Sequence, residues 1–329
     1  MIFVPLLENP KAGFFMAGKF KYYLILHIIV LVWGITGILG DEISVSAEKI
    51  TFLRTGISFA SLLLVGLFIK ENKKIELKEM LLLLGTGVIV GLHWYCFFYS
   101  IKISTVSIGV VCMSSSTLFT SLLEPLLFKR KVELSEVLLS FAIMIGIVII
   151  FGFETQYAKG IGYGLLSAFF AAFFTVANGR FIKRTSSFKI TKFEMLGGFL
   201  TLLFILGISG QINSDIISDV RRSDWAYLTI LGVVCTTIAF MISVWVMKHV
   251  TPFTVSMSIN MEPIYTIILA LVIAGMRGST KENMSPGFYG GGLIIIASIF
   301  INAYIKKISN SKKKNANRGA LDDNEEILA

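Results

Sequence analysis

The chain alternates long apolar stretches with short polar ones from residue 22 onward. Most stretches reach the about 20 residues that a transmembrane helix needs. They are continuously apolar rather than alternating, which argues against a membrane β-barrel. We therefore predict an all-α polytopic membrane protein with ten transmembrane helices. The predicted spans are 22–40, 50–69, 80–101, 103–128, 135–152, 161–181, 191–210, 225–247, 251–275 and 286–305.

Two terminal segments flank these spans. Residues 1–21 do not resemble a signal peptide, because prolines and a glutamate interrupt their apolar part. We expect a cytoplasmic N-terminal segment there, of which residues 1–15 are an extension without a structural role. Residues 306–329 form a charged cytoplasmic tail whose low apolar content predicts disorder.

Composition leaves little room for a soluble domain. The chain is 55% hydrophobic and 16% charged, with a mean hydropathy of +0.77, whereas soluble domains are about 25% charged. The cysteines Cys96, Cys112 and Cys235 lie singly in apolar stretches. That pattern indicates small apolar side chains rather than a disulfide framework or a metal site. Nucleotide-binding motifs are missing as well, so we expect no cofactor.

The net charge of +9 reports membrane topology rather than nucleic-acid binding. Twenty-two of the 30 Lys and Arg residues flank alternate connections or lie in the two terminal segments. Cytoplasmic connections are rich in these residues. We therefore predict a multi-pass protein of the cell (inner) membrane with both termini in the cytoplasm, as an even number of spans requires.

The two halves of the chain resemble each other weakly. Residues 85–111 can be aligned with residues 232–258, and each segment leads to one lysine, Lys102 or Lys248, before a span that starts with Ser and Thr. Five spans per half is an odd number, so the second half inserts inverted relative to the first. Inverted repeats recur in secondary transporters, with the substrate site between them near the bilayer midplane. The predicted halves are 22–152 and 153–305.

Five short segments follow one another in a distinctive order. They are "WGITGILG" in the first span, "FLRTGISF" in the second, "SIKISTVSIGVV" across the third and fourth, "EPLLFKRK" at the end of the fourth, and "TPFTVSMSINMEPIYTIILALVIAG" in the ninth. With these segments the chain resembles the EamA-like family of the drug/metabolite transporter superfamily over about residues 17–306. One departure is Gly275-Met276, where the family often has Gly-Glu.

The resemblance implies two inverted five-helix halves around a central cavity and a small polar metabolite, such as an amino acid, as cargo. We expect a secondary transporter that exports by alternating access, and not an enzyme. A passive facilitator or channel is the alternative. An intramembrane enzyme acting on lipid-linked substrates is a weaker one, because clusters of acids or histidines are missing. The expected partners are a small-molecule substrate, the lipid bilayer and protons as a candidate coupling ion, and the chain works as a monomer or a homodimer.

Glu262 and Pro263 lie in the middle of the ninth span. A carboxylate is costly at that depth, and a proline breaks the helical hydrogen-bond ladder. Asn260 could satisfy backbone groups that the break frees. One interpretation is a structural kink, with Glu262 hydrogen-bonded to neighbouring helices. We favour a role in a transport cavity, for substrate binding or for proton coupling, because ionisable groups at mid-membrane are usually functional.

Arg54 and His93 are the other ionisable candidates. Arg54 in the second span either reaches the interface near Glu48 or binds an anionic group, which is a substrate carboxylate or Glu262. These two interpretations stay open from the sequence. His93 in the third span is predicted to face the bundle, where it could bind substrate or exchange a proton.

Polar and aromatic residues complete the predicted cavity. Ser114 and Ser116 occupy the region that the repeat alignment pairs with Glu262, and their hydroxyls either line the cavity or let helices approach closely. Tyr99, Asn178 and Trp33 are further candidate wall residues.

A last group of residues is predicted to form gates or anchors. Glu124 lies close in sequence to "FKRK", where it can pair with a Lys or Arg at the cytoplasmic end. Lys102 and Lys248 mark equivalent tight connections. The GxxxG spacings, for instance Gly87 with Gly91, predict close helix packing.

Overall fold

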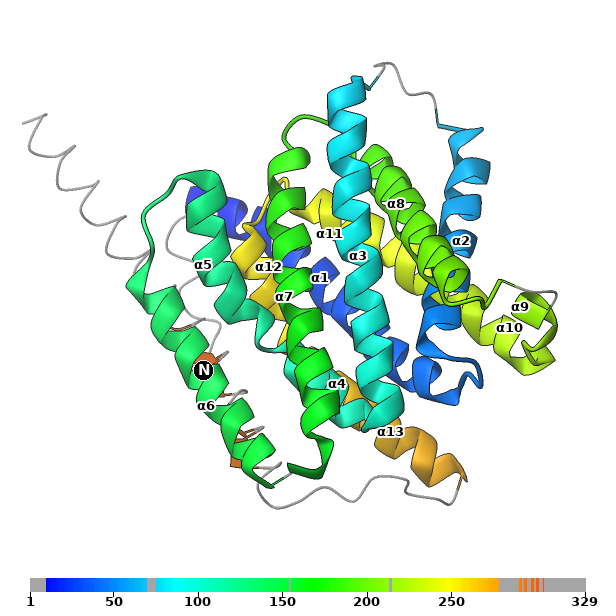
Figure 1. Cartoon of the computed structure of the whole chain (residues 1–329). Helices are drawn as coiled ribbons and strands as arrows, with labels where there is room; N and C mark the ends of the chain where they lie inside the picture. Colours follow the sequence, from blue (N-terminus) through cyan, green and yellow to red (C-terminus); the bar gives the residue numbers. More distant parts are fainter. Residues whose placement is uncertain are drawn as a thin grey trace, which may run out of the picture.

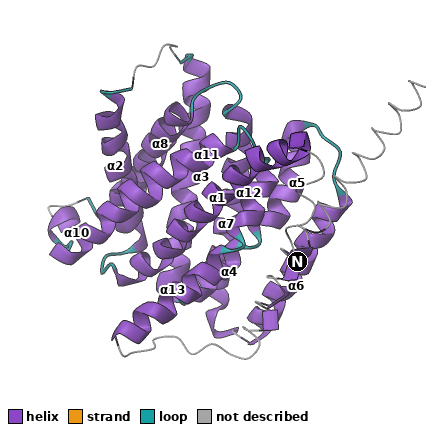
Figure 2. Cartoon of the chain, turned by 180° about the vertical axis from the view of Figure 1, so that it is seen from behind, coloured by secondary structure: helices purple, strands orange, loops and turns teal. Residues whose placement is uncertain are grey.

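The computed structural model describes residues 10–69, 75–153, 155–212 and 215–277, together with nine single residues between 290 and 304. Within these ranges every regular element is a helix (Figure 2). The predicted all-α class is confirmed. The expectations for residues 1–9 and 306–329 lie outside the described residues.

The helices follow the predicted spans closely. They are α1 (Pro10–Glu42), α2 (Ala47–Gly66), α3 (Leu77–Ile103), α4 (Val106–Met113), α5 (Ser116–Phe128), α6 (Leu134–Phe153), η2 (Thr155–Tyr157), α7 (Ala158–Phe181), α8 (Ser187–Ile208), α9 (Asp215–Ser218), α10 (Arg222–Thr229), η3 (Ile230–Ile238), α11 (Ala239–Val246), α12 (Pro252–Ile259) and α13 (Glu262–Arg277). Helix α1 begins well before the predicted start at residue 22. Several spans are built from consecutive helices.

Seven helical stretches of the described chain are long and apolar enough to cross a membrane. They include α4 with α5 as one stretch and α10 through α11 as another. The predicted fifth span is α6, of which Leu134–Ile149 counts as a shorter apolar helix. The ninth corresponds to α12 and α13, and most of the tenth lies outside the described residues. The chain is thus a polytopic membrane protein, and the count of ten spans stays a prediction.

Large apolar side chains point outward along whole helices. On α6, Leu138, Phe141, Ile145 and Val148 are each more than half exposed. Their spacing places them on one face of the helix. A continuous exposed apolar face is unfavourable in water and suits contact with lipid. Figure 1 shows α6 at the edge of the bundle.

Two spans are broken at equivalent positions. Helix α4 ends at Met113 and α12 ends at Ile259, and a two-residue turn separates each from the next helix. Threonine caps both helices, since Thr105 accepts from the Ile108 N–H and Thr251 from the Thr254 N–H. The broken spans pack on each other, α4 against α13 and α5 against α12 (Figure 1).

Helix α3 lies between α7 and α8 and packs tightly on both (Figure 1). Towards α8 the contact is made through glycines, and a Cβ on Gly91 would lie 3.0 Å from the Cα of Gly198. Towards α7, a Cβ on Gly164 would lie 3.1 Å from the Oγ of Ser100 on α3. The predicted close packing at these glycines is confirmed. It brings the His93-containing face of α3 to the centre of the bundle.

Candidate functional site

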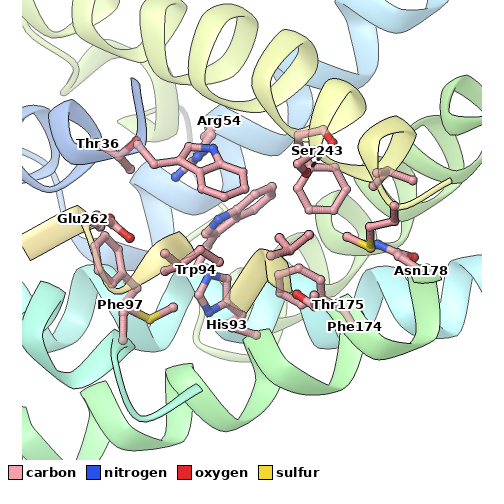
Figure 3. A pocket seen from close by; sticks show the side chains of 18 residues that line it. Thr36, Arg54, His93, Trp94, Phe97, Phe174, Thr175, Asn178, Ser243 and Glu262 are labelled. Carbon is pink, nitrogen blue, oxygen red and sulfur yellow. Dashed lines mark hydrogen bonds between the residues drawn. The ribbon is translucent and has the colours of Figure 1, made fainter. Parts of the chain in front are cut away.

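A buried cavity lies at the centre of the bundle (Figure 3). Side chains from α1, α2, α3, α4, α7, α11, α12 and α13 line it, so both halves of the chain contribute. The cavity volume is about 60 Å³. That space holds a few water molecules. The cavity is therefore small in this conformation.

Arg54 is almost fully buried in the cavity wall, with 1% of its surface exposed. Its Nε donates a hydrogen bond of 2.5 Å to the Thr236 hydroxyl, and its guanidinium carbon lies 4.3 Å from the Trp94 ring centroid. Such stacking on an indole stabilises a cation. The Nη1 atom has no hydrogen-bond partner among the described residues. The structure thus contradicts the interpretation in which Arg54 reaches the membrane interface near Glu48.

Thr236, the hydrogen-bond partner of Arg54, lies in the π-helical segment η3. In η3 the Thr236 hydroxyl donates to the Leu231 carbonyl five residues earlier, which leaves its oxygen free to accept from Arg54. The Cys235 carbonyl accepts from the Trp33 indole N–H at 3.0 Å. Insertions of this kind occur often at functional sites because they redirect side chains and free carbonyl groups. The sequence pattern did not reveal this segment.

Glu262 opens α13, immediately after the break in the ninth span, and is 5% exposed. It lines the same cavity as Arg54 (Figure 3). Among described residues, the ion pairs within 4.0 Å are Lys49–Asp219, Arg130–Glu124 and Arg130–Glu136, so Glu262 does not touch Arg54. The site therefore presents one guanidinium and one carboxyl group that line the same cavity without forming an ion pair.

His93 also faces the cavity, as Figure 3 shows. Its Nδ1 lies 2.8 Å from the Ser167 hydroxyl and 2.9 Å from the Ser167 carbonyl. The carbonyl accepts a hydrogen bond from the Nδ1–H, which fixes the ring and leaves Nε2 as an acceptor when the ring is neutral. A hydrogen-bonded, oriented imidazole can serve as a contact for a substrate donor.

Aromatic side chains form most of the remaining cavity wall. Trp94, Phe97, Phe174 and Phe240 come from three helices, and Trp94 projects into the middle of the space in Figure 3. Ring pairs join them, with centroids 6.0 Å apart for Trp94 and Phe240. The wall is thus apolar except at a few polar points, as in ligand pockets generally. Trp94 was not among the binding residues predicted from the sequence.

The structure brings five of the predicted binding residues together in the cavity and leaves five outside it. Glu262, Arg54, His93, Asn178 and Trp33 line it; Asn260, Pro263, Tyr99, Ser114 and Ser116 do not.

Those outside the cavity are placed as follows. Asn260 accepts a hydrogen bond from Thr117 of the other broken span at 3.0 Å and so ties the two breaks together. Pro263 is buried in the first turn of α13. Tyr99 packs against Tyr163. The hydroxyls of Ser114 and Ser116 are buried at the other break and have no hydrogen-bond partner among the described residues.

Glu124 has the predicted cationic partner. Its Oε1 accepts from the Arg130 Nε at 3.1 Å, and its Oε2 accepts from the Phe253 N–H at 2.7 Å. Phe253 lies in the first turn of α12, where a helix favours a negative charge. Glu124 thereby connects the end of α5 to the start of α12. Lys102 donates hydrogen bonds to the Asp41 and Ile43 carbonyls at the C-terminal end of α1. Lys248 is exposed in its turn.

One buried carboxyl group was not predicted from the sequence. Glu194 on α8 is 0% exposed and accepts a hydrogen bond from the Asn178 amide at 3.1 Å. The predicted seventh span began at residue 191, which put Glu194 near its edge. Helix α8 begins earlier, at Ser187, so that Glu194 is its eighth residue, a depth at which an acid is rare in a membrane span.

Known proteins provide independent comparisons. The chain matches the EamA-like transporter family over residues 20–152 and 158–304. It is 24% identical over 200 residues to GDP-fucose transporter 1 of Dictyostelium discoideum, a match that covers 59% of this chain and about half, 52%, of that protein. Uncharacterized transporter YxxF of Bacillus subtilis (strain 168) is 20% identical over 280 residues, covering 82% of this chain and 88% of that one.

Two further matches point the same way. Uncharacterized transporter YdfC of Bacillus subtilis (strain 168) is 25% identical over 236 residues, covering 69% of this chain and 74% of that one. A crystal structure with 17% identity superposes with a TM-score of 0.63 over 87% of this chain and 97% of that one, which shows the shared fold. These matches indicate a transporter rather than an enzyme. The chain belongs to the EamA-like transporter family of the drug/metabolite transporter superfamily.

Proposed function

We propose that this protein is a secondary transporter that exports small polar metabolites, with zwitterionic amino acids as the cargo class. The observation that carries the proposal is that Arg54 and Glu262 line one buried cavity without forming an ion pair. Two buried charges of opposite sign that do not pair are costly. A ligand that brings both complementary charges removes that cost.

The chemistry of the cavity matches an amino acid at three points. A guanidinium binds a carboxylate through parallel N–H donors, and Arg54 has the unpartnered Nη1 for this. The Glu262 carboxylate suits an ammonium group. The aromatic wall around Trp94 and Phe174 suits an apolar side chain.

The name of the Dictyostelium relative raises a nucleotide sugar as a second cargo. Such a molecule carries a diphosphate and therefore net negative charge. Among the described cavity residues Arg54 is the one permanent cation, and Glu262 opposes it. A zwitterion fits this balance better than a polyanion.

Alternating access is supported by the arrangement of the two broken spans. Their equivalent breaks and crossed packing agree with an inverted repeat, and the family match falls on two separate stretches of the chain. Contacts between the halves occur at both ends, through Ser44 with Asp224 and through Glu124 with the Phe253 N–H. Transport then requires that the contacts at one end open while those at the other hold.

Orientation and setting follow from the charge pattern. We place the protein in the cell (inner) membrane with both termini in the cytoplasm, because Lys and Arg concentrate in that set of connections. The end that carries Ser44 and Asp224 is then the outer end, and the end that carries Glu124 is the cytoplasmic end. The protein works as a monomer or a homodimer, and a proton gradient is the proposed driving force.

The test is uptake of labelled amino acids by liposomes that contain the purified protein. We expect saturable uptake by the wild type. Glu262→Gln, which keeps the shape but removes the charge, should lower uptake at subsaturating substrate by about tenfold or more, or about 1.4 kcal/mol of lost interaction. Glu48→Gln, a half-buried acid in the first turn of α2, is the matched control and should transport normally.

Each other outcome has a definite meaning. Equal uptake by wild type and Glu262→Gln would remove this carboxylate from the site. Flux that rises linearly with substrate concentration, without saturation, would favour the passive facilitator. Absence of transport for every amino acid, with retained folding, would overturn the cargo proposal.

A further inference from the structure

A second carboxyl group lies deep in the bundle, outside the cavity wall. Glu194 on α8 is 0% exposed. Its Oε2 accepts from the Asn178 Nδ2 at 3.1 Å, while its Oε1 has no hydrogen-bond partner among the described residues. It is the eighth residue of α8, so its Cα lies about 10 Å along the helix from the first turn.

Among the described residues, no cation lies within ion-pair distance of this carboxyl. Helix α8 packs against α2, α3 and α11, and the Asn178 partner comes from α7. The charged and titratable groups of these elements include Arg54, Lys78, Glu79, His93, Arg180, Lys189 and Lys192. None of them pairs with Glu194, whose one described polar contact is the hydrogen bond from Asn178.

Two of the other buried acids show the difference from Glu194. Glu124 is held by Arg130, and Glu262 shares its cavity with Arg54. An isolated carboxylate is strongly disfavoured in such surroundings, and binding a proton removes the uncompensated charge. Beside Glu194 the backbones of α3 and α8 touch at Gly87 and Gly197. Such close packing accommodates a proton more readily than a hydrated metal ion.

Asn178 connects this carboxyl to the cavity. It lines the cavity wall, at the end opposite Glu262 in Figure 3, and its Oδ1 has no partner among the described residues. A carboxylate accepts from the amide N–H, whereas a protonated carboxyl donates to the amide oxygen. Protonation of Glu194 therefore allows the Asn178 amide to turn over, which exchanges the positions of its donor and acceptor at the cavity wall.

We propose that Glu194 is the site that binds the coupling proton, and that Asn178 transmits its protonation state to the cavity. This inference rests on the proposed transport function and refines it. Glu262 and Arg54 then stay ionised and bind the substrate, while the proton is carried on a separate helix. Substrate and proton influence each other through one amide group.

Protonation can be measured without transport. Infrared difference spectra of the protein in lipid bilayers, recorded over a pH series, should show the C=O stretching band of a buried protonated carboxyl. We expect Glu194→Gln to remove that band. Glu79→Gln is the matched control, because Glu79 on α3 also has an oxygen without a partner, and it should keep the band. A wild-type band that survives in Glu194→Gln, or no band at all, would overturn the proposal.

Transport separates coupling from binding. A gradient of about one pH unit supplies about tenfold accumulation for one coupled proton. We expect Glu194→Gln to lose this accumulation but to keep substrate exchange at equal pH, and Glu194→Asp, which retains a carboxyl, to recover part of the response. Glu262→Gln should lose both the accumulation and the substrate exchange at equal pH.

The remaining outcomes also decide the matter. Unchanged accumulation by Glu194→Gln would show that the proton binds elsewhere. Accumulation driven by a sodium gradient and indifferent to pH would assign a different ion and overturn the proposal. If no amino acid were exchanged by the wild type, the cargo proposal would fail, while the infrared band would still decide whether Glu194 binds a proton.

Discussion

At the scale of single residues, burial decides which charges can work. Arg54 left two interpretations open in the sequence because it is the fifth residue of its predicted span, about 6 Å from the start and within reach of the interface for a long side chain. The structure resolves this choice, since Arg54 stacks on Trp94 and donates to Thr236. Both partners are distant in sequence, so no local pattern could indicate them.

The planar guanidinium is central to the proposed role of Arg54. Lysine keeps the charge but lacks the flat donor array that stacks on an indole and grips a carboxylate. We expect Arg54→Lys to weaken binding of amino acids by about tenfold, or about 1.4 kcal/mol. Binding to the purified protein, measured by calorimetry, checks this.

The control for that variant is the ligand itself. An amino acid amide lacks the carboxylate, so wild type and Arg54→Lys should bind it equally. A loss of the same size for the acid and the amide would mean that Arg54 supports the fold rather than the carboxylate.

At the scale of elements, irregular helices carry the site. Proline at residue 263 predicted the break before α13, and the structure shows an equivalent break at Ser114 and Ser115 that no proline announces. The π-helical η3 was not predicted either. Its existence depends on tertiary hydrogen bonds to Arg54 and Trp33, which compensate the altered backbone ladder.

Glycines between α3 and α8 set how closely these elements approach. A Cβ at Gly87 would meet the backbone of Glu194 and lie 2.9 Å from the Cα of Gly197, neither of which can move aside cheaply. We expect Gly87→Ala to destabilise the protein by about 1–3 kcal/mol. Thermal or denaturant unfolding in detergent measures the change.

The neighbouring Gly85 provides the comparison. A Cβ there meets nothing within 4 Å and would point away from the bundle. Gly85→Ala should leave stability unchanged or raise it slightly, since alanine favours the helix. Equal destabilisation by both variants would argue against close packing as the cause.

At the scale of the whole molecule, both ends of the bundle are joined across the two halves. At the predicted outer end Ser44 donates to Asp224 from both its backbone N–H and its hydroxyl. A disulfide between cysteines at these two positions should hold that end closed. We expect the oxidised Ser44→Cys/Asp224→Cys variant to lose transport, and a reductant to restore it.

The native cysteines do not interfere with this experiment, because Cys96, Cys112 and Cys235 are free and buried. Each single cysteine variant is the control and should transport with or without oxidant. Full transport by the cross-linked protein would contradict movement at this end.

Four features could be predicted from the order of residues alone. They are the membrane-embedded, all-α fold, most span boundaries, the break at Glu262 and the pairing of Glu124 with the nearby "FKRK" segment. These features depend on local composition, on helix-breaking residues, or on partners only six residues apart. Tertiary structure alone decided which side chains share the cavity. The ionisable and amide groups of the cavity come from four different helices: Arg54, His93, Asn178 and Glu262. Glu194 on α8 is hydrogen-bonded to Asn178 on α7. The energy of a buried charge depends on such distant neighbours, which the order of residues along one chain does not reveal.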